Sequence, residues 1–144
     1  MTPAYLHTDG RVLPKLPEKP HRMLLIAEIG VETSFMEDLA AAIEASGCLY
    51  FMAWGEACAR WDDEVDVANL AAHGFEDVPS DKFIMTTWHG DEPLSEAMWF
   101  AQHCALRSYD DRPLPTLVLL HLAATPNETG VAAAFRSAVD GTSD

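Results

Sequence analysis

Side chains able to do chemistry are concentrated at one junction in the middle of the chain. An apolar run that begins at Phe83 ends in Thr86–His89, turns at Gly90 and continues into Asp91–Pro93. This pattern predicts a strand followed by a helix, and α/β proteins usually place their sites at such junctions. A histidine beside carboxylates can act as a general base or bind a divalent metal ion.

Two further candidates lie near the ends of other apolar runs, and both would reach the same edge of a parallel sheet. The full set of catalytic candidates is His89, Glu28, His121 and Asp91, and Glu56, Thr87 and Glu92 are expected at the same edge. Each has a structural alternative, in which Asp91 or Glu92 caps the helix and His121 is a hydrogen-bonded core histidine.

No catalytic or cofactor motif accompanies these residues. The patterns HExxH, DxDxDG, GxGxxG, GxxxxGK[ST] and GxSxG are all absent. We therefore expect no cofactor and no resident metal, and the residues leave open whether the protein is an enzyme.

The elements that must position these residues alternate along the chain. Four apolar runs without polar alternation are each followed by a helical segment, which predicts parallel strands covered on both faces. These runs are 23–29, 48–54, 83–88 and 116–122. The fold class is therefore α/β, a single three-layer domain of about four mainly parallel strands with helices on both faces, in a flavodoxin-like or Rossmann-like order. A 2-1-3-4 order is preferred, which would place Glu28 beside Thr87–His89, with His121 approaching from the fourth strand.

The domain organisation follows from composition. Residues 1–22 hold four prolines and predict an extended Pro-rich arm, residues 23–140 form the single α/β domain, and residues 141–144 form a C-terminal tail. The predicted third helix carries more apolar surface than one face needs, around Trp99 and Phe100. We expect this surplus to lie under the arm or to contact another chain.

Charge and composition exclude several classes of partner. Of the 144 residues, 9 are Lys or Arg and 23 are Asp or Glu, which gives a net charge of −14. Such a surface repels nucleic acid and anionic membranes, and the apolar runs are too short to span a bilayer. The N-terminal segment lacks the apolar stretch of a signal peptide, and the three cysteines lie in apolar segments, as buried thiols in a reducing compartment do. These features predict a cytoplasmic protein.

The leading functional hypothesis is a non-enzymatic acidic module that binds a protein partner with a basic surface, as an immunity-type or accessory protein. The residues expected to contact the partner are Asp62, Asp63, Glu64, Asp66, Glu92, Glu96 and Trp99. The alternative is a small hydrolase, or a ligand- or metal-binding domain, with its site at the C-terminal edge of the sheet. Either version is expected to be a monomer or a weak homodimer.

The segment from Thr86 to Phe100 is also similar in sequence to a known family. Its residues Thr86–His89, Glu92–Leu94, Glu96 and Trp99-Phe100 resemble the signature of a small bacterial domain family of unknown function. The resemblance implies a small cytosolic bacterial protein and supplies no catalytic residue.

Overall fold

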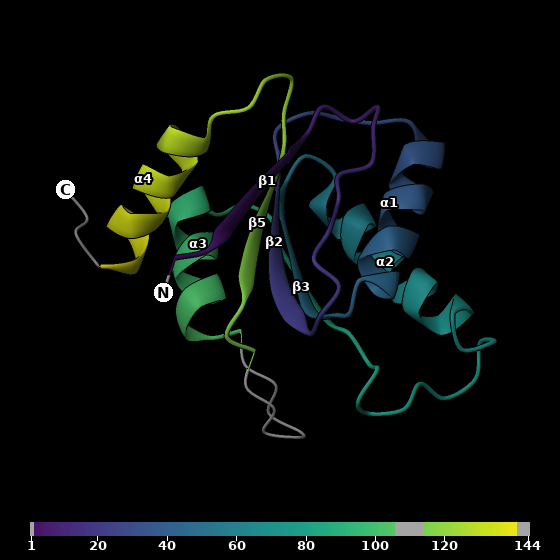
Figure 1. The fold of residues 1–144 in the computed structure, drawn as a ribbon. Coiled ribbons are helices and arrows are strands. Elements are labelled where there is room, and N and C mark those ends of the chain that lie inside the picture. Colours follow the sequence, from purple (N-terminus) through teal and green to yellow (C-terminus); the bar gives the residue numbers. More distant parts are fainter. Residues whose placement is uncertain (1, 106–113, 141–144) are drawn as a thin grey trace.

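A five-stranded parallel sheet forms the middle layer of the protein (Figure 1). The computed structural model describes residues 2–105 and 114–140. The strands are β1 (Ala4–Thr8), β2 (His21–Ala27), β3 (Cys48–Gly55), β4 (Met85–His89) and β5 (Leu117–Leu122), in the spatial order β1-β5-β2-β3-β4.

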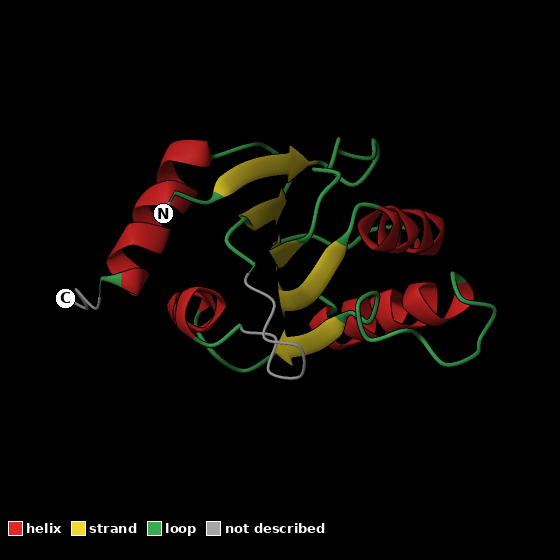
Figure 2. Ribbon diagram, turned by 60° about the horizontal axis from the view of Figure 1, so that its bottom comes forward, coloured by secondary structure: helices red, strands yellow, loops and turns green. Residues whose placement is uncertain are grey.

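Two pairs of helices cover the two faces of this sheet (Figure 2). Helices α1 (Thr33–Ala45) and α2 (Cys58–Ala71) pack on one face, and α3 (Leu94–His103) and α4 (Glu128–Val139) pack on the other. The predicted fold class, a single three-layer α/β domain with parallel strands, is confirmed.

The central strands are buried because both of their faces meet helices. Every residue of β2 and of β5 is buried, and their side chains alternate between the two cores. Met23 and Leu25 face α1 and α2, whereas Leu24 and Ile26 face α3 and α4. This two-sided burial explains why the strands read as continuous apolar runs in the sequence.

The strand order differs from the preferred 2-1-3-4 order: the four predicted strands lie in the order 3-2-1-4, which agrees with the Rossmann-like alternative. β2 pairs with β3 and β5, and β4 follows β3 at the edge of the sheet, so the first and third predicted strands are not neighbours. The chain proceeds outward from β2 to β4 and then crosses back to place β5 on the other side of β2. The topological switch point therefore lies between β2 and β5.

The N-terminal segment also differs from its prediction as an arm outside the sheet. Residues 4–8 form the edge strand β1 beside β5, and Leu16 packs into the core under α1 and α2. The segment does not cover the surplus apolar surface of α3, because Trp99 remains 47% exposed. The predicted C-terminal tail, 141–144, lies outside the described residues.

The cysteines divide into two kinds. Cys48 and Cys58 are buried as predicted, and burial raises the pKa of the Cys48 thiol to about 12, which keeps it protonated and unreactive. Cys104 is exposed, so the prediction of a buried thiol is wrong there. No helix within the described ranges is long and apolar enough to cross a membrane.

Candidate functional site

The strand register places three histidines in one row across the carboxyl end of the sheet. His7, His121, Ile26, Trp54 and His89 occupy matching positions on β1, β5, β2, β3 and β4. Side chains at matching positions of a parallel sheet point to the same face. The row therefore lies on the α3/α4 face, with polar groups at each end and apolar side chains between them.

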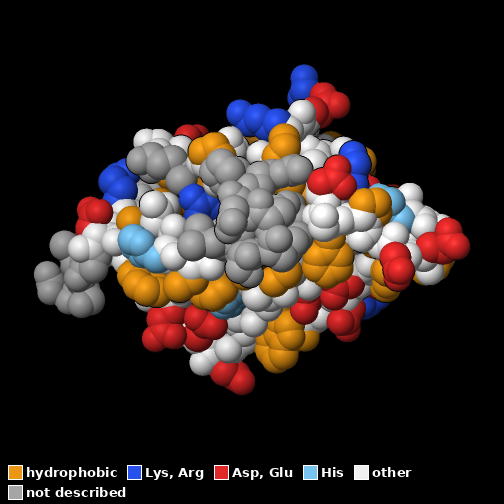
Figure 3. Space-filling model, turned by 90° about the horizontal axis from the view of Figure 1, so that it is seen from below, with side chains coloured by type: hydrophobic (Ala, Val, Ile, Leu, Met, Phe, Trp, Pro, Cys, Tyr) orange, Lys and Arg blue, Asp and Glu red, His pale blue; other side chains and the backbone are white. Residues whose placement is uncertain are grey.

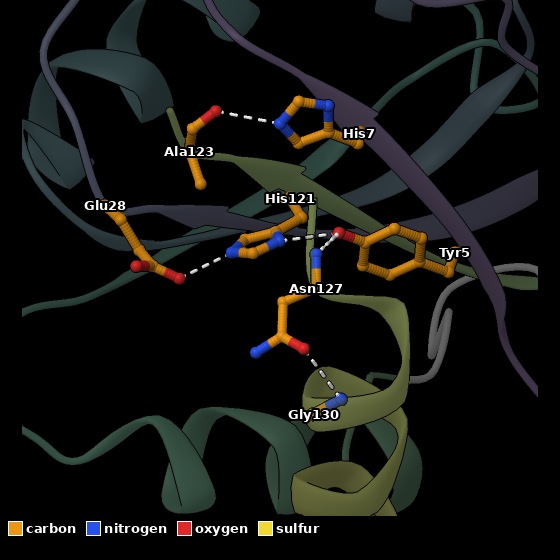
Figure 4. Close-up of polar contacts among 7 residues, drawn as sticks. All are labelled: Tyr5, His7, Glu28, His121, Ala123, Asn127 and Gly130. Carbon is orange, nitrogen blue, oxygen red and sulfur yellow. Dashed lines mark hydrogen bonds and ion pairs between the residues drawn. The ribbon is translucent and has the colours of Figure 1, made fainter. Parts of the chain in front are cut away.

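The first polar group, which we call the switch-point cluster, consists of Tyr5, His7, Glu28, His121 and Asn127 (Figure 4). His121 Nε2 lies 2.5 Å from Glu28 Oε2, and His121 Nδ1 lies 2.7 Å from Tyr5 Oη. The His121 side chain is 3% exposed, whereas the Glu28 side chain is 52% exposed. A buried imidazole thus holds an exposed carboxylate at the switch point, where open α/β sheets bind ligands.

The donor and acceptor in each hydrogen bond of this cluster can be assigned from one backbone N–H, which can only donate. The backbone N–H of Asn127 donates to Tyr5 Oη at 2.9 Å. The Tyr5 hydroxyl is then free to donate to His121 Nδ1, which leaves the proton of His121 on Nε2 for Glu28. Each contact uses one proton, so the start of α4 is connected to Glu28 by three hydrogen bonds in series.

Neighbouring contacts hold the ends of this cluster. His7 Nε2 lies 2.8 Å from the Ala123 carbonyl oxygen, directly after β5, and its ring lies 6.1 Å from that of His121. The Asn127 side chain caps α4 by accepting a hydrogen bond from the Gly130 N–H. His121 therefore meets the description of a hydrogen-bonded core histidine, and Glu28 supplies the accessible atoms of the cluster.

The second polar group surrounds His89 at the ends of β3 and β4. His89 is buried; its Nε2 lies 2.9 Å from Thr87 Oγ1, and its Nδ1 lies 3.1 Å from Glu92 Oε1. The Trp54 indole N–H donates to the Glu92 carbonyl oxygen at 2.8 Å. A hollow of about 350 Å³ opens there, lined by Trp54, Gly55, His89, Gly90, Asp91, Glu92 and Pro93.

The expectation that Asp91 or Glu92 caps α3 is wrong. Pro93 occupies the N-cap position, and no side chain makes a cap hydrogen bond there. Asp91 instead adopts a left-handed backbone conformation, with φ of 57°, which is uncommon for a residue with a side chain. The Glu92 carboxylate does not cap the helix and instead lies 3.1 Å from His89 Nδ1.

The two polar groups are separate, contrary to the prediction that Glu28 lies beside Thr87–His89. β3 lies between β2 and β4, which separates them by two strand spacings, or about 10 Å. The part of the prediction that brought His121 to this edge agrees with the structure, because β5 is the neighbour of β2.

A third group consists of carboxylates on α2. One carboxylate oxygen each from Asp62, Asp63 and Asp66 lies within 4.8 Å of the others, and Thr86 Oγ1 of β4 donates to Asp66 at 2.9 Å. Burial raises the pKa of Asp66, the Thr86 hydrogen bond partly opposes this, and repulsion from Asp62 and Asp63 raises the pKa further. Glu64 is not part of this group, because helical periodicity places it on the other side of the buried Trp61 and Val65.

Exposed aromatic side chains lie on both sides of β4. Trp88 of β4 is 53% exposed, on the same side of the strand as Thr86, and Trp99 of α3 is 47% exposed. Glu96 and Trp99 share one face of α3, since they are three residues apart in the helix, and Glu92 lies just before its N-cap. In Figure 3, acidic and hydrophobic side chains lie next to one another along the lower rim of the molecule. We call this region the β4 surface: Asp62, Asp63, Asp66, Trp88, Glu92, Glu96 and Trp99.

Several residues of these groups were not singled out from the sequence. Tyr5 and His7 lie in the segment assigned to the arm, although their spacing of two is the period of a strand. The local sequence does not distinguish Trp54 from an ordinary packing residue, and it contains no signal that Thr86 would bond to Asp66. The local sequence contains no signal that Tyr5 would meet His121, 116 residues away.

Among known protein families, one matches this chain over almost its whole length. Residues 3–138 match a family described as a domain of unknown function (DUF7684). The chain belongs to this family. No curated protein and no solved structure matches it.

Proposed function

We propose that the protein is a non-enzymatic binding module and that its β4 surface binds a protein partner with a basic surface. One observation carries the proposal: Trp88 and Trp99 are about half exposed beside carboxylates, on either side of the free edge strand of the sheet. One side of each ring is covered within the chain, since the Trp99 ring lies 4.9 Å from that of His103 and Trp88 lies beside Gly90. The exposed half of each tryptophan remains available, and tryptophan is among the residues that dominate binding energy in protein interfaces.

The electrostatics of the β4 surface favour a basic partner. The surface carries five carboxylates and, among its residues, no lysine or arginine, in a chain of net charge −14. Complementary charge accelerates association and selects against acidic partners. Among the described residues no strand pairs with the outer edge of β4, so its backbone groups there are open to a partner strand or loop.

The proposal extends to the biological setting. An acidic module that neutralises a basic toxin acts through this kind of charged surface, so we assign the protein to the immunity-type or accessory class. We propose a cytoplasmic, bacterial protein that acts as a monomer or a weak homodimer, in keeping with the resemblance of its junction segment. Neither nucleic acid nor membrane is a partner, since both carry the same sign of charge.

Capture of the partner from the host tests the proposal. The tagged protein, a Trp88→Ala/Trp99→Ala variant and a Phe75→Ala control are each incubated with host lysate, and captured proteins are quantified. Phe75 is also exposed but follows the far end of α2. We expect a basic protein that the wild type and the control retain, that the double variant loses, and that high salt releases. Equal capture by all three variants, or capture indifferent to salt, would contradict the proposal.

The switch-point cluster favours a second candidate, a ligand-binding or hydrolytic domain that uses Glu28 and His121. A metal version of this candidate is tested by elemental analysis and by thermal unfolding with divalent ions. Binding to the folded state alone raises stability by about 2.7 kcal/mol when the ion is at about 100 times its dissociation constant. A protein without metal, and without a shift for any ion, would exclude that version.

A further inference from the structure

We infer that the hollow at the ends of β3 and β4 is a socket for a cationic side chain, and that its ligand is an arginine presented by the partner. The inference rests on the proposed function for the source of that arginine. The evidence for the socket itself comes from the residues that line the hollow. The lining combines an indole, a buried histidine and two carboxylates, from Trp54, His89, Asp91 and Glu92.

The socket is organised before any ligand arrives. Thr87 and Glu92 hold the two ring nitrogens of His89, and the Trp54 indole fixes the backbone of Glu92. The Phe100 ring packs against the His89 ring, with centroids 4.8 Å apart. Groups fixed in this way lose little conformational entropy on binding.

The atoms left free in the socket are acceptors. Glu92 uses Oε1 for His89, and its Oε2 has no hydrogen-bond partner among the described residues. The Asp91 side chain is exposed, and Asp91 is one of the residues that line the hollow. None of the described lining residues is a lysine or an arginine. A ligand that satisfies these acceptors must bring hydrogen-bond donors and positive charge.

The start of α3 does not reverse this preference. A helix N-terminus favours negative charge, but Glu92 and Glu96 already supply carboxylates before and within the first turn of α3. An anion entering the hollow would meet Asp91 and Glu92 at short range. The local field therefore repels anions and attracts cations.

The shape of the groups selects arginine over lysine. A guanidinium is planar, stacks on an indole face and donates two parallel hydrogen bonds to a carboxylate, whereas an ammonium is a compact, strongly hydrated charge. Trp54 offers the aromatic wall and Glu92 the carboxylate in the same hollow. The hollow thus supplies both contacts that distinguish arginine.

A pair of probes of nearly equal shape, one cationic and one neutral, tests the socket without the partner. N-acetyl-arginine methylamide and its neutral citrulline analogue are titrated into ¹⁵N-labelled protein, and the Trp54 indole resonance is followed by NMR. We expect the arginine probe to bind about tenfold more tightly than the citrulline probe. Glu92→Gln should abolish this preference, while Glu96→Gln, on the same helix but outside the hollow, should keep it.

The outcomes separate the socket from the proposed function. Equal binding of the two probes, an unmoved Trp54 resonance, or an unchanged preference in a folded Glu92→Gln variant would overturn the socket. Arginine binding in a protein for which the host yields no partner would support the socket and contradict the proposed function. A partner whose capture is lost with the two tryptophans but not with Glu92→Gln would support the function and overturn the socket as its anchor.

Discussion

At the residue scale, we expect the hydrogen bonds of His121 to make a measurable contribution to the free energy of unfolding. Replacing His121 by Leu keeps a similar volume but removes both bonds, and leaves the Tyr5 hydroxyl without its acceptor. We expect the free energy of unfolding to fall by about 1–3 kcal/mol, as measured by urea denaturation. Glu28→Gln, which keeps an acceptor at an exposed side chain, should cost less than about 0.5 kcal/mol.

A double-mutant cycle tests whether Tyr5 and His121 act as one unit. Tyr5→Phe removes the acceptor of the Asn127 N–H and the donor to His121. Because the two residues share a hydrogen bond, the double variant should lose at least about 0.5 kcal/mol less than the sum of the single losses. Strictly additive losses would show that the contact contributes no coupling energy.

The pKa of Asp66 predicts a pH-dependent stability effect on the β4 surface. Its pKa is raised above the ordinary value of 3.8 in the folded state, so ionised Asp66 lowers stability at neutral pH. This penalty disappears as the pH falls through the raised pKa, because the folded protein takes up the proton first. Asp66→Asn, which keeps an acceptor for Thr86, should therefore unfold at a higher temperature than wild type at pH 7.

The same comparison near pH 4 completes this test. The advantage of Asp66→Asn should shrink there, because wild-type Asp66 takes up its proton in the folded state as the pH falls. An Asp66→Asn variant that is less stable than wild type at pH 7, or a difference that does not change with pH, would contradict the assignment.

At the element scale, one glycine fixes how β3 turns toward α2. Gly55 has a φ of 98°, and a Cβ there would lie 2.1 Å from the Ala27 carbonyl oxygen of β2. Gly55→Ala should cost at least about 3 kcal/mol, since both strain and a backbone clash oppose it. Gly74→Ala is the matched control: its φ is also positive, at 66°, but nothing lies within 4 Å, so about 1 kcal/mol is expected. Equal losses in urea denaturation would contradict the close approach.

The edge strand β1 predicts that the N-terminal segment is part of the folded domain. Deleting residues 1–8 exposes the edge of β5 and removes Tyr5 and Leu6 from the cores. We expect the free energy of unfolding to fall by at least about 3 kcal/mol. Val12→Ala, a change at an exposed residue of the same segment, should have little effect. A truncated protein as stable as wild type would show that the segment is a dispensable tail.

The elements were predictable where their patterns are local. The buried strands β2, β3 and β5 are recognisable in the sequence as apolar runs, and the helices follow them closely. The choice between the flavodoxin-like and the Rossmann-like order was not predictable, because a buried run does not specify which neighbours it pairs with. β1 was missed because its five residues lie in a Pro-rich segment, directly after Pro3, and are mostly only partly buried.

The candidate sites show the same limit. His89 and Glu92 are three residues apart and were recognised together, whereas Tyr5 reaches His121 only through the pairing of β1 with β5. Glu28 is separated from His89 because β3, and not β4, is the neighbour of β2 in the sheet.

At the scale of the whole molecule, the sheet divides its chemistry between two places. The switch-point cluster lies between β2 and β5 near the centre of the sheet, and the β4 surface lies at its free edge. The first is a chain of hydrogen bonds made within the protein, and the second combines carboxylates with two half-exposed tryptophans. This division is why we assign partner binding to the edge rather than to the switch point.

Hydrogen exchange of the captured complex tests that assignment most directly. The free protein and its complex with the basic host partner are exchanged in deuterated buffer, and protection is mapped by mass spectrometry. The account predicts new protection in the α2 segment around Asp62–Asp66 and in residues 85–99, which carry the exposed tryptophans. Protection confined to the segments around Glu28 and His121, with the β4 surface unchanged, would contradict it.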